Sequence, residues 1–243
     1  MKKLLPIIRY ECATILKYIW IFYTIMCGVV LISFALTYIL TGSFGNLSLN
    51  ALEINSMVYL CVIAILGSSQ DFKMLLQSGY PRKYIYLGAL SLFLFTSVLM
   101  TTVDMIIAAV LRGVSARYLP LFDVIYGEDH SLFINWIWTF CIYLFVCSLA
   151  YFFAVLQRKI GKIPFVITTV AIGMMVLLII PALVLVYLPD EARAKLFTFI
   201  ARVFGFLADG STSFLNPLLA LIIVLGLFGT ASYFLLSKTE LRT

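Results

Sequence analysis

Long uninterrupted apolar segments dominate this chain of 243 residues. Hydropathy separates six of them, at about residues 18–40, 51–69, 84–111, 132–156, 163–188 and 213–237. About 20 apolar residues in a helix are enough to cross the hydrocarbon core of a bilayer. The chain is 63% hydrophobic and only 12% charged, whereas about 25% of the residues of a soluble domain are charged. The sequence therefore predicts an all-α polytopic membrane protein, with six transmembrane helices in a single domain over residues 1–243.

The basic residues predict the orientation of these helices. If both termini are cytosolic, the inner segments hold 12 of the 17 lysines and arginines, and the outer loops hold the remaining 5. Cytosolic loops of membrane proteins carry an excess of Lys and Arg. The distribution thus predicts that both termini are inside. The net charge of +6 then reflects orientation in the membrane, and no basic patch for nucleic acid is present in the sequence.

The N-terminal stretch, "MKKLLPIIRYECATILKYIW", is basic but a poor signal peptide. Arg9, Glu11 and Lys17 interrupt its apolar residues, and a full-length span follows without an evident cleavage site. We expect residues 2–17 to form an amphipathic helix that lies on the cytosolic interface, with its basic side chains near lipid phosphates.

Two of the predicted outer loops are longer than turns. Residues 112–131 are long enough for a small extracellular cap. In residues 189–212, Pro189 and Asp190 indicate a helix start. Apolar side chains then recur at helical spacing, at Leu196, Phe197, Ile200, Val203, Phe204 and Leu207. This pattern predicts an interfacial or re-entrant hairpin on the outer side, with Phe197, Ile200 and Phe204 on its apolar face.

Motifs for catalysis, metal binding or nucleotide binding are missing from the sequence. The single histidine, His130, has too few neighbouring ligands for a metal site. The only Gly-Lys pair, Gly161-Lys162, lacks the other residues of a P-loop. The five cysteines form no CxxC and are interpreted as small apolar fillers. We expect this chain to be no enzyme and to bind no cofactor itself.

Two acidic residues, Glu53 and Asp104, fall inside predicted spans. Intramembrane carboxylates are candidates for substrate or ion pathways. Both, however, are expected near the outer interface, because Asp104 lies 20 residues, or about 30 Å of helix, beyond Tyr84. Structural pairing or interfacial solvation is therefore favoured over contact with a substrate.

The most informative stretch is "SSQDFKMLLQSGYPRKYIYLGAL", residues 68–90, between the second and third spans. Ser68 and Asp71 have the spacing of a helix N-terminus. Phe72, Leu75 and Leu76 then share one apolar face. Gly79 suits the left-handed position after a helix, and Pro81 prevents the helix from continuing. We predict a short amphipathic helix on the cytosolic side, which either receives a partner protein or only rests on lipid headgroups.

At these residues the sequence resembles the type-two ABC exporter permeases, small six-span membrane subunits common in Gram-positive bacteria. Asp71-Phe72 is similar to the acidic-aromatic pair of that family. Gly79, Arg82 and Lys83 are similar to its Gly-x-x-Arg-Lys element. The similarity in sequence is specific only around residues 70–88, whereas the expected architecture agrees along the whole chain.

The resemblance implies a multi-pass protein of the bacterial plasma membrane that forms a homodimer and docks on a separate ATP-binding subunit. ATP and magnesium would bind to that partner. The coupling residues implied are Asp71, Phe72, Leu75, Leu76, Gly79, Arg82 and Lys83. The abundance of aromatic residues, 20 Phe, 14 Tyr and 3 Trp, favours a hydrophobic or amphipathic cargo such as an antimicrobial peptide, a toxin or a lipid.

Two other functions remain open from the residues. The chain could be a stand-alone membrane immunity or sensor protein that uses residues 189–212 to contact an external peptide or lipid. It could also be an intramembrane enzyme, which ranks last because no convergent pair of catalytic residues is visible.

Overall fold

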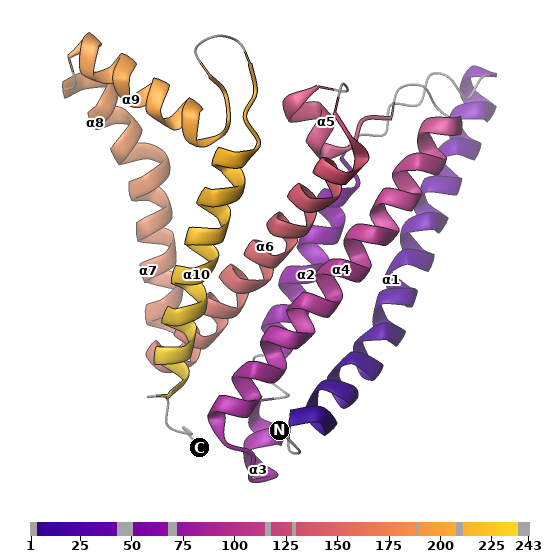
Figure 1. The fold of residues 1–243 in the computed structure, drawn as a ribbon, viewed down its shortest axis with the longest axis vertical. Helices are drawn as coiled ribbons and strands as arrows, with labels where there is room; N and C mark the ends of the chain where they lie inside the picture. The colour runs from indigo at the N-terminus through magenta and orange to yellow at the C-terminus, as the bar shows by residue number, and fades with distance from the viewer. Residues whose placement is uncertain are drawn as a thin grey trace. The chain divides into compact units, whose positions relative to one another are not determined.

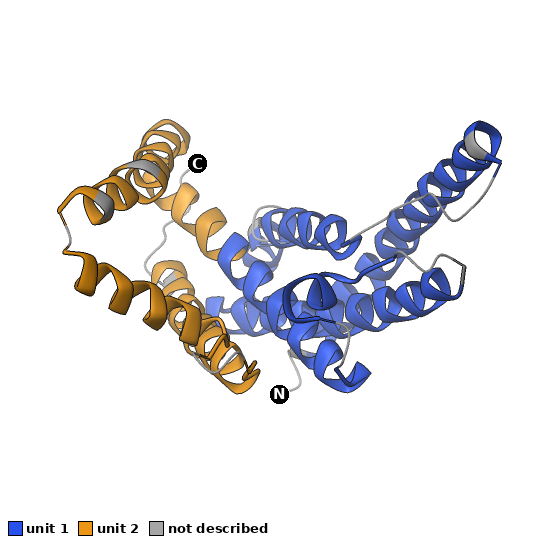
Figure 2. Ribbon diagram, turned by 90° about the horizontal axis from the view of Figure 1, so that it is seen from above, with its two compact units in different colours: residues 1–150 blue, residues 151–243 orange. Residues whose placement is uncertain are grey.

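The computed structural model describes residues 4–42, 51–67, 72–114, 118–127, 130–187, 189–207 and 211–237. These residues are almost entirely helical, and they form no β-sheet. The chain divides into two compact units, residues 1–150 and 151–243, which Figure 2 shows in different colours. The all-α class predicted from the apolar runs is confirmed.

The first unit is built around α4 (Arg82–Val114), a helix of 33 residues. The helices α1 (Leu4–Thr41), α2 (Glu53–Leu66) and α3 (Phe72–Gln77) each pack against it. The short helix α5 (Leu121–Tyr126) follows α4, and most of α6 (Leu132–Ile160) completes the unit. Figure 1 shows α3 and the start of α1 at one end of this unit, and α5 at the other.

Small residues allow α1 and α4 to approach closely. A Cβ atom added at Gly88 of α4 would lie 2.8 Å from Cγ2 of Ile7, which is far inside van der Waals contact. Ser97, Thr96 and Thr101 of α4 are fully buried. Small side chains at helix interfaces let backbones pack tightly in a membrane, where dispersion contacts replace the hydrophobic effect between helices.

The second unit contains the end of α6 and four further helices: α7 (Lys162–Met174), α8 (Ile180–Tyr187), α9 (Asp190–Val203) and α10 (Leu215–Ser237). A π-helical segment, η3 (Met175–Ile179), joins α7 to α8 without a break. It ends two residues before Pro181, which lacks an amide donor for the normal helical bond. The wider π turn accommodates this loss. Within this unit, α9 runs across the ends of α8 and α10 (Figure 1).

Five helices among the described residues are long and apolar enough to cross a membrane. They are Leu5–Leu40, Arg82–Gly113, Leu132–Ile160, Lys162–Val184 and Leu215–Leu236. The predicted second span, residues 51–69, corresponds to α2, which has 14 residues. At 1.5 Å per residue it is about 21 Å long, which is shorter than the hydrocarbon core of about 30 Å. The structure therefore shows a multi-pass protein with five long helices and one shorter apolar helix, and the prediction of six full-length spans is not confirmed.

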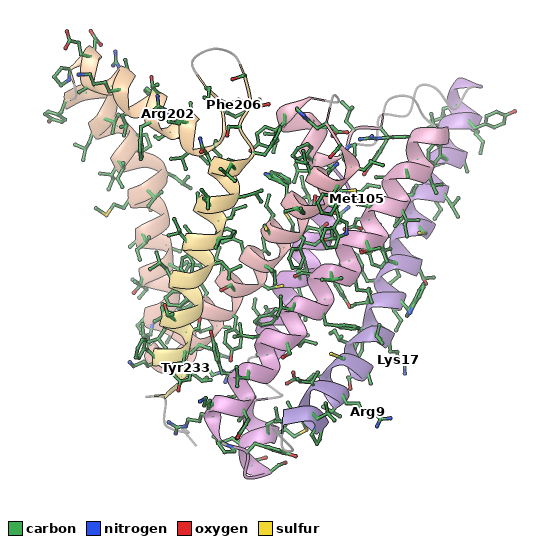
Figure 3. The ribbon with its side chains drawn as sticks, viewed as in Figure 1. Arg9, Lys17, Met105, Arg202, Phe206 and Tyr233 are labelled. Atoms are coloured by element: carbon green, nitrogen blue, oxygen red, sulfur yellow. The ribbon has the colours of Figure 1, made fainter. Side chains whose placement is uncertain are left out.

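The N-terminal region differs from its prediction. A separate interfacial helix was expected over residues 2–17, followed by a span from residue 18. The structure instead has one continuous helix, α1, of 38 residues. None of residues 4–17 after Pro6 is a proline or glycine, so nothing in the backbone interrupts the helix. Arg9 and Lys17 point outward from this part of α1 (Figure 3).

Candidate functional site

The short helix α3 ends in a well-defined cap. Gly79 has φ +78°, its amide donates to the carbonyl of Leu76 at 3.1 Å, and the amide of Tyr80 donates to the carbonyl of Leu75 at 3.1 Å. This pair of bonds is the Schellman motif that closes helices with a left-handed residue. The left-handed conformation predicted for Gly79 after the helix is confirmed. Ser68 and Asp71, which were expected at the helix start, lie outside the described residues.

Pro81 joins α3 directly to α4. Its carbonyl accepts hydrogen bonds from the amides of Tyr84 at 2.9 Å and Ile85 at 3.3 Å, so α4 begins at the next residue, Arg82. Residues 78–81 are the whole connection between the two helices. A connection with a capped end on one side and a proline on the other leaves little freedom between them. The end of α3 and the start of α4 are therefore closely connected.

The predicted coupling residues that the structure describes fall into three groups by exposure. Phe72 and Leu75 are each 5% exposed, so they anchor α3 within the first unit. Arg82 and Leu76 are half-buried. Gly79 and Lys83 are exposed. The surface available to a partner thus consists of the exposed residues Met74, Gln77, Ser78, Gly79, Pro81 and Lys83. Of these, sequence reasoning missed Met74, which is the apolar side chain turned outward.

A buried acid lies further along α4. Asp104 is 5% exposed and accepts hydrogen bonds from three other helices. Tyr23 of α1 donates to Oδ1 at 2.8 Å, Ser56 of α2 donates to the same oxygen at 3.1 Å, and Tyr143 of α6 donates to Oδ2. A buried carboxylate is tolerated when its oxygens are satisfied in this way. The interpretation of Asp104 as a structural residue is supported, because Asp104 on α4 and its partners on α1, α2 and α6 connect four helices.

The two tyrosines of this cluster also bond to backbone. Tyr23 donates to the carbonyl of Met100 at 3.1 Å, and the hydroxyl of Tyr143 lies 3.5 Å from the carbonyl of Glu53. Both tyrosines are almost fully buried. Neither they nor Ser56 could be identified from the sequence, because contacts between distant helices leave no local pattern.

Glu53, the first residue of α2, binds the segment around α5, which is called the cap here. Its side chain is 3% exposed, and the amide of Leu121 donates to Oε2 at 3.3 Å. The amide of Ala51 donates to the carbonyl of Leu119 at 3.1 Å. Burial, reinforced by the carboxylates of Glu53 and Asp104, raises the pKa of Tyr118 above its ordinary value. The Tyr118 hydroxyl therefore stays neutral. Because Glu53 is buried and bonded to the Leu121 amide, we interpret it as a structural acid.

The same cap contains an ion pair and the single histidine. Arg112 at the end of α4 pairs with Asp123 of α5, whose side chain is 5% exposed. The Nε2 atom of His130 lies 3.2 Å from the carbonyl of Tyr126, and its ring meets the edge of Phe122. The histidine is therefore half-buried against the cap instead of fully solvated. The described residues hold no group of three or more metal-ligating side chains.

In the second unit, α9 matches the predicted outer helix. It begins at Asp190, as expected, and Phe197, Ile200 and Phe204 are 54%, 41% and 59% exposed. After α9 the chain turns at Gly205, and Phe206 pairs with Thr212 in an isolated antiparallel bridge. A hairpin with apolar side chains on its surface is thus present.

No protein-family model, no curated protein and no solved structure matches this chain. The function is therefore argued from the residues and their geometry.

Proposed function

We propose that this chain is the membrane subunit of an ATP-driven exporter, of the type-two ABC permease class, and that α3 is its coupling helix. The observation that carries the proposal is the construction of α3 itself. It is anchored inward by Phe72 and Leu75, capped at Gly79, and joined to α4 through Pro81. Met74 on its outward surface, and Lys83 in the first turn of α4, are left for a partner.

Transmission through α4 follows from its length. Asp104 lies 22 residues after Arg82, which is about 33 Å of helix at 1.5 Å per residue. A push on α3 would move α4 along or about its axis. The hydrogen bonds of Asp104 to Tyr23, Ser56 and Tyr143 would pass that movement to α1, α2 and α6. The cluster would thus convert one helix movement into a rearrangement of the unit.

The remaining parts of the proposal are its topology, partners and cargo. The chain would cross the bacterial plasma membrane six times, with α2 as the short second span and both termini inside. It would form a homodimer, dock on a separate ATP-binding subunit that holds ATP and magnesium, and export a hydrophobic or amphipathic cargo. The excess of basic residues in the inner segments supports this orientation. Reporter fusions after Gly127 and Gly161 test it: the first should report an outer position and the second an inner one.

The docking experiment uses exposed residues of α3 and of the first turn of α4. Lys83→Glu and Met74→Arg should abolish co-purification of an ATPase with the tagged protein from its native membrane, while the permease stays folded. Lys162→Glu, at an exposed lysine that begins α7, is the matched control and should retain the ATPase. If no ATPase accompanies the unmodified protein, or if both Lys83→Glu and Met74→Arg retain it, α3 is no coupling helix.

One observation favours a second function, a stand-alone immunity or sensor protein. The hairpin after α8 exposes Phe197, Phe199 and Phe204, which could contact an external peptide or lipid. Replacing Phe197 and Phe204 by serine should then abolish protection or signalling. The same replacements should leave co-purification of an ATPase unchanged if the exporter proposal is correct.

A further inference from the structure

A cavity of about 300 Å³ lies between the end of α6 and α7 in the second unit. The two helices are joined at Gly161 (Figure 1), which has φ +98°. Its amide donates to the carbonyl of Gln157 at 2.9 Å, and its carbonyl accepts from the amide of Phe165 at 3.2 Å. One residue therefore ends α6 and starts α7, and the cavity begins beside this turn, because Ile160 is part of its wall.

The walls of the cavity are apolar along most of their length. Residues three, four or seven positions apart share one face of a helix, and the apolar wall residues have this spacing: Phe153, Leu156 and Ile160 on α6, and Phe165, Ile172 and Val176 on α7. Two threonines add hydroxyl groups, but no described wall residue is charged. From Phe165 to Val176 the wall is about 16 Å long, which matches one leaflet, half of the hydrocarbon thickness of about 30 Å. The cavity therefore has the length of an acyl chain.

Two lysines lie at the end of the cavity next to the turn. Lys162 precedes Phe165 by three residues and Thr169 by seven, so it lies on the cavity face of α7. Lys159 is the neighbour of Ile160 in the last turn of α6. Both lysines are exposed, and among the described residues neither forms an ion pair. Their ammonium groups are therefore available to a ligand at this end.

Negative charge lies far from this turn in the described part of the second unit. The acids described there are Asp190 and Glu191, in the first turn of α9. The whole of α7, η3 and α8 separates them from Lys162. The turn at Gly161 is thus positively charged, and it favours an anionic ligand over a neutral or cationic one.

We propose that this cavity binds an anionic phospholipid, of the phosphatidylglycerol class. The phosphate lies between Lys159 and Lys162, and one acyl chain lies along Leu156 and Ile172. A free phosphate would use only the lysines, and an uncharged lipid would use only the apolar walls. Each lysine near a membrane surface should strengthen binding of an anionic lipid roughly fivefold. The inference concerns only α6 and α7 and does not depend on the exporter proposal.

The binding test uses the purified full-length protein in dodecyl maltoside, whose headgroup is neutral. A phosphatidylglycerol probe with a photoreactive acyl chain should label residues 153–177, as mapped by mass spectrometry. A phosphatidylcholine probe with the same chains should label them roughly tenfold less. Unlabelled phosphatidylglycerol should displace the first probe, and inorganic phosphate should not, because it has no acyl chain. Equal labelling by the two probes, or displacement by phosphate, would overturn the proposal.

Replacement of the lysines separates charge from folding. The double variant Lys159→Gln/Lys162→Gln should lose phosphatidylglycerol labelling roughly tenfold, while its phosphatidylcholine labelling stays unchanged. A variant that fails to fold would lose both. Lys195→Gln, at an exposed lysine of α9, is the matched control and should retain both. Undiminished phosphatidylglycerol labelling of the double variant would refute the role given to the two lysines.

A second variant fills the cavity. Gly173 is part of its wall, and a Cβ atom added there would meet no other atom within 4 Å. Gly173→Leu should therefore reduce labelling by both probes. Gly226→Leu, at a glycine of α10 with equally open surroundings, is the control and should not change it. If Gly173→Leu is labelled as strongly as the unmodified protein, the acyl chain does not lie in this cavity.

A second copy of the chain is the competing occupant of an apolar surface in the membrane. A photoreactive amino acid in place of Ile172, which is 56% exposed and lines the cavity, distinguishes the two. Irradiation of the native membrane should cross-link this position to phospholipid. A cross-link to another copy of the chain in place of lipid would overturn the proposal.

Discussion

Tyr143 of α6 donates a hydrogen bond to Asp104 of α4, although the two residues lie 39 positions apart in the chain. The opposite oxygen of the same carboxylate accepts from Tyr23 and Ser56. One side chain of α4 therefore connects to three neighbouring helices. This arrangement makes Asp104 the residue through which the helices of the first unit are held in register.

Removal of single hydroxyls should measure this connection. Tyr23→Phe and Tyr143→Phe are each expected to lower the free energy of unfolding by about 0.6–1.7 kcal/mol, the range found for hydrogen bonds between membrane helices. The rings remain, so packing is unchanged. Denaturation by sodium dodecyl sulfate in mixed micelles is the measurement. Tyr187→Phe, at an exposed tyrosine of α8, should have no effect. Equal stability of all three variants would show that the hydrogen bonds of Tyr23 and Tyr143 to Asp104 do not stabilise the fold.

Replacement of Gly79 should loosen the end of α3. Its φ of +78° costs an L-residue roughly 1–2 kcal/mol, while no neighbouring atom would obstruct a side chain there. Gly79→Ala should therefore increase proteolytic cleavage near residues 77–82 without unfolding the protein, and Gly79→Asn should have a smaller effect. Gly113→Ala, at a glycine of α4 that also has open space around it, is the control. Identical cleavage of Gly79→Ala and the control would contradict this view of the cap.

Gly205→Ala is expected to be more damaging than Gly79→Ala. Its φ is also positive, at +91°, but a Cβ atom there would lie 2.6 Å from the backbone carbonyl oxygen of Ser213. Backbone cannot move away as a flexible side chain can. The strain of roughly 1–2 kcal/mol is thus joined by a clash that opens the turn after α9. Hydrogen exchange of the Ser213 amide, which donates to the Gly205 carbonyl at 2.8 Å, should report the opening. Unchanged protection of that amide would argue against a tight turn.

Two ion pairs among the described residues, Arg112–Asp123 and Arg193–Asp190, should differ in their contribution to stability. Asp123 is buried, so Arg112→Gln removes a charged partner from a buried carboxylate and should cost roughly 1.5–3 kcal/mol. Asp190 is 89% exposed in its pair with Arg193. Arg193→Gln should change the free energy of unfolding by less than about 0.5 kcal/mol. Salt should weaken only the exposed pair noticeably. A larger loss for Arg193→Gln than for Arg112→Gln would refute the role given to the buried pair.

Features with a local cause were predictable from the sequence. Runs of apolar residues indicate the long helices, Gly79 and Pro81 indicate the end of α3, and Pro189-Asp190 indicates the start of α9. Features that depend on tertiary contacts were not. The charges at Arg9, Glu11 and Lys17 suggested a boundary that the helix α1 does not have, because charged residues do not interrupt backbone hydrogen bonds. The partners of Asp104 lie on helices that are distant from it in the sequence, so no local sequence pattern indicates them.

The length of α1 has a consequence for how the protein sits in the bilayer. Its apolar stretch, Leu5–Leu40, has 36 residues and is about 54 Å long at 1.5 Å per residue. Even a steep tilt of about 40° leaves it spanning about 41 Å along the membrane normal, against about 30 Å of hydrocarbon. One end of α1 must therefore emerge as a helical stalk. Arg9, Glu11 and Lys17 lie at its N-terminal end, so this end is the one that leaves the lipid. The stalk stands beside α3, and any protein that approaches α3 would meet both.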